Sequence, residues 1–219
     1  MKEVFFVLDT IPLQVSPEDV LKQLGYPDKM SVPPGTHKKV DDEIGETQSL
    51  IEPKGAYCRL DGVPEKGFEL FSAAEGIVLA LATIGPKVER RAGKFVRTDR
   101  AATGVIADAI GTVAVEQTAD FLERKIHEDC ANFGWKVSRR YAPGYCGWAM
   151  EAQKEIFSHF SDTLGIKLTN SCLMIPEKSL SFVCLLSREG DFSKVKVGNC
   201  KRCRQKDCPY RSEPYKPRN

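Results

Sequence analysis

The chain has 219 residues, enough for one compact domain with a hydrophobic core and a small appendage. Hydrophobic residues make up 42% of it and charged residues 28%, the ordinary balance of a globular protein. A net charge of +2 gives no overall field that would attract nucleic acid or a membrane surface, so we expect neither as a partner.

The amino-terminal segment, residues 1–9, is predicted to be a strand. Its apolar run covers five residues and is bordered by acids, which is too short and too acidic for a signal peptide. No apolar run in the chain approaches the length of a membrane span. Eight cysteines without a signal peptide favour a reducing compartment, so we expect a cytoplasmic protein.

A helix is predicted to begin at Ser16, whose hydroxyl can cap the first turn. Pro17 suits the first helical position, and two acids follow it. We expect this helix to end at Gly25. The next segment, residues 28–50, contains prolines, a glycine and scattered charges, and is expected to cover part of the fold or to drape over it.

Two strands are predicted next. Residues 51–60 have strand character, although Pro53 and Gly55 interrupt it. Residues 76–84 form a continuous apolar run with β-branched side chains, bounded by glycine at both ends, which indicates a buried strand.

The longest helical pattern covers residues 99–129 and has one apolar face. Gly104 and Gly111 weaken the helix, but they also permit close packing against a sheet. The apolar positions at near-helical spacing are Ile106, Ile110, Val113 and Phe121.

A shorter amphipathic helix is predicted over residues 150–160. Residues 164–175 and 180–187 are then predicted to be two strands of one hairpin. This succession is α+β, and a twisted antiparallel sheet flanked by helices fits it. We expect residues 1–197 to form this domain and residues 198–219 to form a small Cys-rich basic appendage.

The segment 140–145, Arg-Tyr-Ala-Pro-Gly-Tyr, is the best candidate for a binding loop. Pro143 fixes its own φ and pushes Ala142 toward extended geometry, while Gly144 permits positive φ or close backbone approach. The loop can therefore offer backbone groups, the Arg140 cation and the Tyr145 hydroxyl to a small polar ligand. An ordinary surface turn is the alternative.

The sequence after this loop carries further motifs in a definite order. An amphipathic helix leads to G-x-x-L-T-x-S-x-x-M-x-P at residues 165–176, and then to S-L-S at residues 179–181. The series resembles the S-adenosylmethionine-binding activation domain of cobalamin-dependent methionine synthase, in which the loop reads R-P-x-x-G-Y and the last strand reads S-V-S. Tyr141 and Leu180 depart from the family residues. The resemblance is dense from Arg140 to Ser181 and weaker back to Asp99, and the chain before Asp99 is similar to short, free-standing members.

The resemblance implies an S-adenosylmethionine site made largely by the loop. Its ligand contacts would fall on Arg140, Ala142, Gly144 and Tyr145, mostly through backbone groups, and on Glu116 of the preceding helix. For Arg140 the alternative is a surface ion pair, and for Glu116 it is a solvated position on the flank of the helix. Two further family contacts have no clear counterpart, since Gly134 and Phe192 stand nearest to them. Ser171, Lys178 and Ser181 are expected to be structural.

The carboxyl-terminal tail carries a second candidate site. Cys200, Cys203 and Cys208 form a C-x2-C-x4-C motif among basic residues that would lower the pKa of their thiols. Three thiolates so close together can bind zinc or an iron–sulfur cluster, with the fourth ligand coming from elsewhere. Three unliganded thiols in a flexible tail are the alternative. The candidates for a fourth ligand within the chain are Cys146, Cys172 and Cys184.

The function implied by the resemblance is reductive methylation of inactive cob(II)alamin. An electron from flavodoxin or ferredoxin and the methyl group of S-adenosylmethionine would together restore the methylated cofactor. The chain has no D-x-H-x-x-G cobalt-ligating run and is too short for substrate barrels. We therefore expect it to act in trans on the cobalamin-binding domain of a methionine synthase, or on another corrinoid protein, within a methyltransferase system for methionine biosynthesis. Two other functions remain open: a zinc or iron–sulfur scaffold, and an electron-transfer activator of corrinoid methyltransferases.

Overall fold

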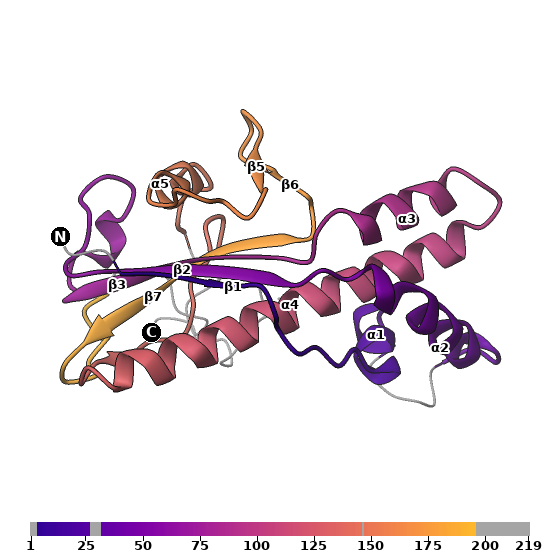
Figure 1. The fold of residues 1–219 in the computed structure, drawn as a ribbon, viewed down its shortest axis with the longest axis horizontal. Coiled ribbons are helices and arrows are strands. Elements are labelled where there is room, and N and C mark those ends of the chain that lie inside the picture. Colours follow the sequence, from indigo (N-terminus) through magenta and orange to yellow (C-terminus); the bar gives the residue numbers. More distant parts are fainter. Residues whose placement is uncertain (1–3, 27–31, 146, 196–219) are drawn as a thin grey trace, which may run out of the picture.

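A five-stranded antiparallel sheet forms the centre of the computed structural model, which describes residues 4–26, 32–145 and 147–195 (Figure 1). Helices lie beside this curled sheet, so the predicted α+β class is confirmed. In spatial order the strands are β1 (Val4–Leu8), β2 (Lys54–Leu60), β3 (Gly76–Thr83), β7 (Ser179–Ser187) and β4 (Lys136–Val137).

Both faces of the sheet are covered, which explains why β3 is buried at every position. Side chains alternate between the faces of a strand. Val78 therefore packs in the cluster that includes α4 (Ala101–Ala131), while its neighbour Leu79 packs in the cluster that includes α5 (Ala152–Ser158). The predicted helices over residues 99–129 and 150–160 correspond to α4 and α5 and are confirmed.

The amino-terminal half of α4 extends past the sheet and forms a helical end of the molecule (Figure 1). Three helices pack against it there, burying two small apolar clusters. These are α1 (Pro17–Gln23), α2 (Thr36–Thr47) and α3 (Lys87–Val96). Strand β1 and helix α1 were predicted, and α1 begins as expected, with the Ser16 hydroxyl accepting from the Asp19 N–H at 3.1 Å.

Helix α2 was not predicted, and a 3-10 helix, Gln48–Leu50, follows it. The sequence signal was hidden because the buried face of α2 includes the polar Glu43. Glu43 is only 5% exposed, and Arg91 of α3 pairs with it at 2.6 Å. A buried ion pair thus replaces an apolar position, and hydrophobic periodicity cannot show it.

Helix α3 was also missed, and it changes the role expected of Gly104. A Cβ atom at this glycine would lie 2.9 Å from the Ala92 carbonyl oxygen and 2.8 Å from a Val96 methyl, both on α3. The glycine therefore permits close contact between two helices, and the expected contact of Gly104 with a sheet was wrong. The apolar spacing of Val88, Ala92 and Phe95 was the available signal for α3.

The predicted strand over residues 164–175 was wrong. Its ends form a separate two-stranded sheet, β5 (Lys167–Leu168) with β6 (Met174–Ile175), and neither strand joins the central sheet. Between them the chain turns back: the Leu173 N–H donates to the Thr169 hydroxyl at 3.0 Å, and Cys172 has a positive φ of 63°. Polar side chains of this kind favour such turns.

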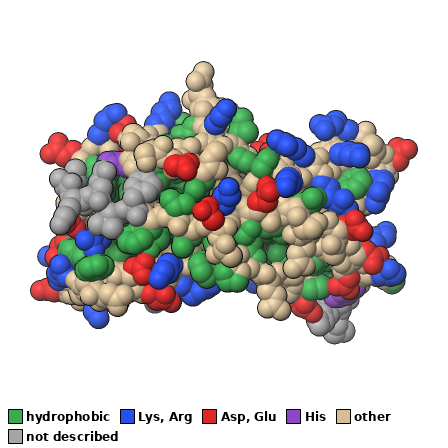
Figure 2. Space-filling model, in the orientation of Figure 1, with side chains coloured by type: hydrophobic (Ala, Val, Ile, Leu, Met, Phe, Trp, Pro, Cys, Tyr) green, Lys and Arg blue, Asp and Glu red, His purple; other side chains and the backbone are tan. Residues whose placement is uncertain are grey.

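The surface drawn in Figure 2 carries charges of both signs, because the chain has 32 basic and 30 acidic residues. Among the described helices, none combines the length and the apolar character needed to cross a membrane. The boundary predicted near residue 197 and the tail itself lie outside the described residues.

Candidate functional site

The predicted binding loop, residues 140–145, starts at the edge of β7. The N–H of Tyr141 donates to the carbonyl of Val183, and the N–H of Val183 donates to the carbonyl of Tyr141, each at 2.8 Å. Adjacent side chains of such an extended segment point to opposite faces. The Tyr141 ring accordingly packs 5.7 Å from that of Phe71 on the α5 face, whereas Arg140 reaches toward α4.

Arg140 is surrounded by three carboxylates of α4. Its Nη2 atom lies 2.9 Å from Glu116, and its Nη1 atom lies 2.6 Å from both Asp120 and Glu123. The Arg140 backbone N–H also donates to Glu123 at 3.0 Å. The three acids share one face of α4 because they are spaced four and three residues apart. The structure thus brings Glu116 and Arg140 together. The Arg140 side chain forms ion pairs, which was the alternative to ligand binding given for it above.

This cluster holds three carboxylates and one guanidinium, so it is rich in negative charge. Burial, with the nearby Asp120 charge, raises the pKa of Glu116, and the Arg140 charge opposes that rise. Burial by itself would lower the pKa of Arg140, but Asp120 and Glu123 outweigh it and keep the pKa above its ordinary range. Arg140 therefore stays charged, and the surplus carboxylate can attract a second cationic group.

Residues 142–145 form part of a tight turn that is hydrogen-bonded to Trp148. The Gly144 N–H donates to the Trp148 carbonyl at 2.8 Å, and the Trp148 N–H donates to the Tyr145 carbonyl at 3.0 Å. Gly144 has a φ of 85°, and a Cβ atom there would lie 2.6 Å from the Met150 methyl carbon. This position therefore needs glycine for its conformation and for its space. The Tyr145 side chain is 53% exposed, so its ring faces solvent at this turn.

Trp148 anchors the turn to the core. Its side chain is buried, and its indole N–H donates to the Gly67 carbonyl at 2.8 Å. Its ring meets the ring of Phe71 edge-on, with 4.8 Å between the centroids. A buried aromatic residue with its polar atom satisfied fixes the carboxyl-terminal end of the turn.

Several backbone groups of the loop lack a hydrogen-bond partner among the residues that the structure describes. Within the described part of the chain, the Ala142 N–H and the carbonyls of Pro143 and Gly144 make no hydrogen bond with protein groups. Backbone N–H and carbonyl groups normally find a partner. The loop can therefore offer donors and acceptors to a small polar molecule.

Two buried side-chain oxygens near the loop also have no hydrogen-bond partner: Oγ of Ser181 and Oε1 of Gln153. Ser181 lies two residues before Val183, so it is on the same face of β7 and next to the point where the loop departs. Gln153 contacts the loop through Met150, because its Nε2 atom lies 3.1 Å from the Met150 sulfur. Unsatisfied buried oxygens are uncommon and call for an explanation. Ser181 was expected to be structural. Its missing hydrogen-bond partner makes it a candidate ligand contact, and the sequence alone does not show this.

Asp120 and Glu123 were not selected from the sequence, although they lie on the same helical face as Glu116. Their spacing of four and three residues from Glu116 onward could have placed them on that face from the sequence. Lys178 has the structural role expected of it, since its ammonium group lies 2.7 Å from Asp108 and 3.0 Å from the Thr112 hydroxyl.

The predicted metal ligands Cys200, Cys203 and Cys208 lie outside the described residues, as does Cys146. In the described ranges, no three His, Cys, Asp or Glu side chains form a group suited to a metal ion. Cys184 lies between the sheet and α4, where burial raises the pKa of its thiol well above the ordinary value. A thiol in that environment resists forming the thiolate that a metal requires, so Cys184 is a poor fourth ligand.

Comparison with known proteins gives a likeness of fold and no match of sequence. No protein-family profile matches the sequence, and no curated protein matches it. Among solved structures, the chain is similar to the MetH reactivation domain bound to AdoHcy, with a TM-score of 0.59. The likeness covers 83% of this chain and 78% of that one, at 14% sequence identity. The chain therefore has the fold of a reactivation domain, an α+β sheet with flanking helices.

Proposed function

We propose that this protein binds S-adenosylmethionine at the loop of residues 140–145 and acts in trans to reactivate a cobalamin-bearing partner by reductive methylation. The observation that carries the proposal is the likeness of fold to a reactivation domain bound to AdoHcy, over most of both chains. The R-x-x-P-G-Y loop and the motif strands that follow it support the same assignment.

The residues around the loop match the chemistry of this ligand. S-adenosylmethionine carries an ammonium group, a carboxylate, a ribose diol and an adenine, each of which needs a hydrogen-bond partner. Glu116 and Asp120 supply negative charge for the ammonium group. The Ala142 N–H and the Gly144 carbonyl supply backbone contacts. The unpartnered Ser181 hydroxyl lies on the α5 face of β7, the opposite face from Glu116, so it would serve a part of the ligand that reaches past the edge of this strand.

The chemistry that S-adenosylmethionine supplies when bound is an activated methyl group on a sulfonium. No side chain of the protein has to act as an acid or a base for its transfer. The chain's contribution is to hold the ligand in one orientation and to keep water from it. The Gly144 turn is hydrogen-bonded to Trp148, whose buried indole is bonded to the Gly67 carbonyl, and these contacts suit that task.

The partner would be the cobalamin-binding domain of a methionine synthase or another corrinoid protein, with flavodoxin or ferredoxin as the electron donor. The hairpin β5-β6 and helix α5 lie on the same side of the sheet (Figure 1). Leu173 and Ile175 of the hairpin are 64% and 52% exposed. A modest surface of this kind suits a transient complex.

Two measurements test the proposal. The first is calorimetric titration of the full chain with AdoHcy and with S-adenosylmethionine, where saturable binding is expected. The second is reactivation of a cobalt(II) methionine synthase core that lacks its own activation domain, with reductant and S-adenosylmethionine, in the presence and absence of this protein. Binding without reactivation would overturn the role in trans, and the absence of both would overturn the proposal. Metal-loaded protein that binds neither nucleoside would instead favour the zinc or iron–sulfur scaffold.

A further inference from the structure

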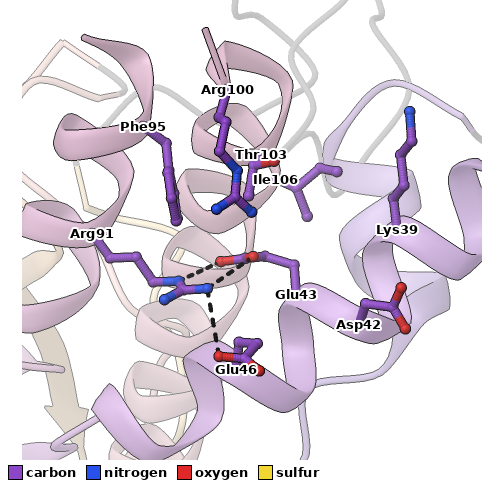
Figure 3. A pocket seen from close by; sticks show the side chains of 9 residues that line it. All are labelled: Lys39, Asp42, Glu43, Glu46, Arg91, Phe95, Arg100, Thr103 and Ile106. Carbon is purple, nitrogen blue, oxygen red and sulfur yellow. Dashed lines mark hydrogen bonds and ion pairs between the residues drawn. The ribbon is translucent and has the colours of Figure 1, made fainter. Parts of the chain in front are cut away.

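A cavity of about 450 Å³ lies at the helical end of the molecule, among α2, α3 and the start of α4 (Figure 3). None of its lining residues belongs to the loop of residues 140–145. Its size is within the range of pockets that hold small molecules. Charged side chains dominate the lining, so any ligand must match their distribution of charge.

The three carboxylates that line this cavity already have cationic partners. Glu43 is held by two hydrogen bonds from Arg91, at 2.6 and 3.1 Å, and Arg91 also lies 3.9 Å from Glu46 (Figure 3). Asp42 pairs with Lys38 at 2.8 Å, one turn back on α2. The negative charges of the cavity are therefore largely compensated within the protein.

Two cations that line the cavity have no such partner. In the described part of the chain, no carboxylate lies within ion-pair distance of Lys39 or Arg100. The Arg100 guanidinium is held over the Phe95 ring, 4.3 Å from its centroid (Figure 3). Stacking of this kind restricts the guanidinium plane and leaves its N–H groups for a carboxylate or a phosphate.

The backbone at the start of α4 adds to this positive character. Arg100 precedes the first turn, which has no side-chain cap and no acidic residue, and Thr103 of that turn lines the cavity with its hydroxyl group. The first N–H groups of a helix lack partners within the helix and favour negative charge.

We propose that this cavity binds a small oxyanion, a carboxylate or a phosphate, with Arg100 and Lys39 as its cationic contacts. The ligand would connect α2 to the junction between α3 and α4. The volume suits a small organic acid or phosphate ester better than a bare inorganic ion. This site is separate from the loop of residues 140–145 and does not depend on the proposed function.

Titration calorimetry with inorganic phosphate and with citrate, at constant ionic strength, tests the site and distinguishes the two kinds of oxyanion. The native chain should bind at least one of them saturably. Arg100→Gln and Lys39→Gln should each weaken that binding about tenfold or more, since a charge-assisted contact is lost. Arg97→Gln is the matched control, because it removes the same charge near the same helix end outside the cavity, and it should change binding less than about twofold.

An opposite substitution gives a second test. Asp42→Asn removes a carboxylate from the lining and releases Lys38 from its pair, so it should tighten binding of the same anion severalfold. Circular dichroism should show that all four variants fold, since these positions are exposed. Equal weakening in Arg97→Gln and Arg100→Gln, weaker binding by Asp42→Asn, or no saturable binding by the native chain would each overturn the proposal.

Discussion

Arg140 and Glu116 are joined by an ion pair, with 2.9 Å between Nη2 of the arginine and Oε2 of the glutamate. Glu116 has to serve this arginine and, in the proposed function, the ammonium group of a ligand as well. Asp120 and Glu123 make that sharing feasible, because each holds Arg140 at 2.6 Å independently of Glu116. In the proposed function, the surplus of carboxylate on this face of α4 leaves Glu116 free to contact the ligand.

Replacing Arg140 by alanine should destabilise the fold. The change leaves three mutually repelling carboxylates beside a partly buried site, and the loss is expected to be about 1–3 kcal/mol. That is less than for a fully buried pair, because water still reaches the groups. Urea unfolding of Arg140→Ala and of the neighbouring Arg139→Ala would measure it. A loss for Arg140→Ala no larger than for Arg139→Ala would contradict the structural role assigned to the cluster.

Glu116 should give stability a specific dependence on pH. Burial raises its pKa above the ordinary value of 4.5, so the native state holds this proton more firmly than the unfolded state. The free energy of unfolding should therefore fall as pH rises from about 4.5 through the raised pKa, and the contribution of this proton is lost above it. Glu116→Gln cannot titrate and should lack this fall. Denaturant midpoints of both proteins, measured across pH 4 to 8, test this. If the prediction is wrong, the difference between the two midpoints will stay constant over that range.

Gly144 should be needed for ligand binding, beyond its effect on stability. Alanine at φ 85° costs about 1 kcal/mol, and its methyl group would also push Met150 aside. Gly147 is the matched control: its φ is 82°, but nothing lies within 4 Å of a Cβ atom there. Both alanine variants should lose similar stability in thermal unfolding, and only Gly144→Ala should bind AdoHcy more weakly. Equal weakening in the two variants would show that the contact with Met150 is unimportant.

Elements with a simple apolar pattern could be predicted from the sequence. Strand β3 was recognisable because it is buried on both faces, and α4 because its length gave many apolar positions. Helix α2 was not recognisable, because Glu43 occupies a buried position only by virtue of Arg91 on a different helix. Such a pair exists only in the folded chain, so no local pattern could reveal it.

The candidate site also has parts that the local sequence predicts and parts that depend on the folded chain. The loop of residues 140–145 was predicted because proline and glycine determine local backbone geometry by themselves. The partners of Arg140 depend on which face of α4 meets β7, and that follows from packing over the whole sheet. The unpartnered Ser181 oxygen could not be foreseen either, because a missing hydrogen bond is visible only in three dimensions.

Replacing Ser181 by alanine should affect ligand binding without lowering stability. Its Oγ is buried without a partner, so Ser181→Ala should keep or raise the free energy of unfolding, by up to about 1 kcal/mol. Ser179 is two residues earlier on β7, and its hydroxyl donates to that of Thr83 at 2.9 Å. Ser179→Ala should therefore lose about 1 kcal/mol.

The two serine variants should rank in the opposite order for ligand binding. Removing the Ser181 hydroxyl takes away a contact that only the ligand would satisfy, so Ser181→Ala should bind AdoHcy several times more weakly than the native chain. Ser179→Ala should bind it normally, because its hydroxyl already serves the fold. Urea unfolding and titration calorimetry on both variants decide the point. Unchanged AdoHcy affinity in Ser181→Ala would show that this oxygen plays no part in the site, and a loss of stability there would show that it has a structural role instead.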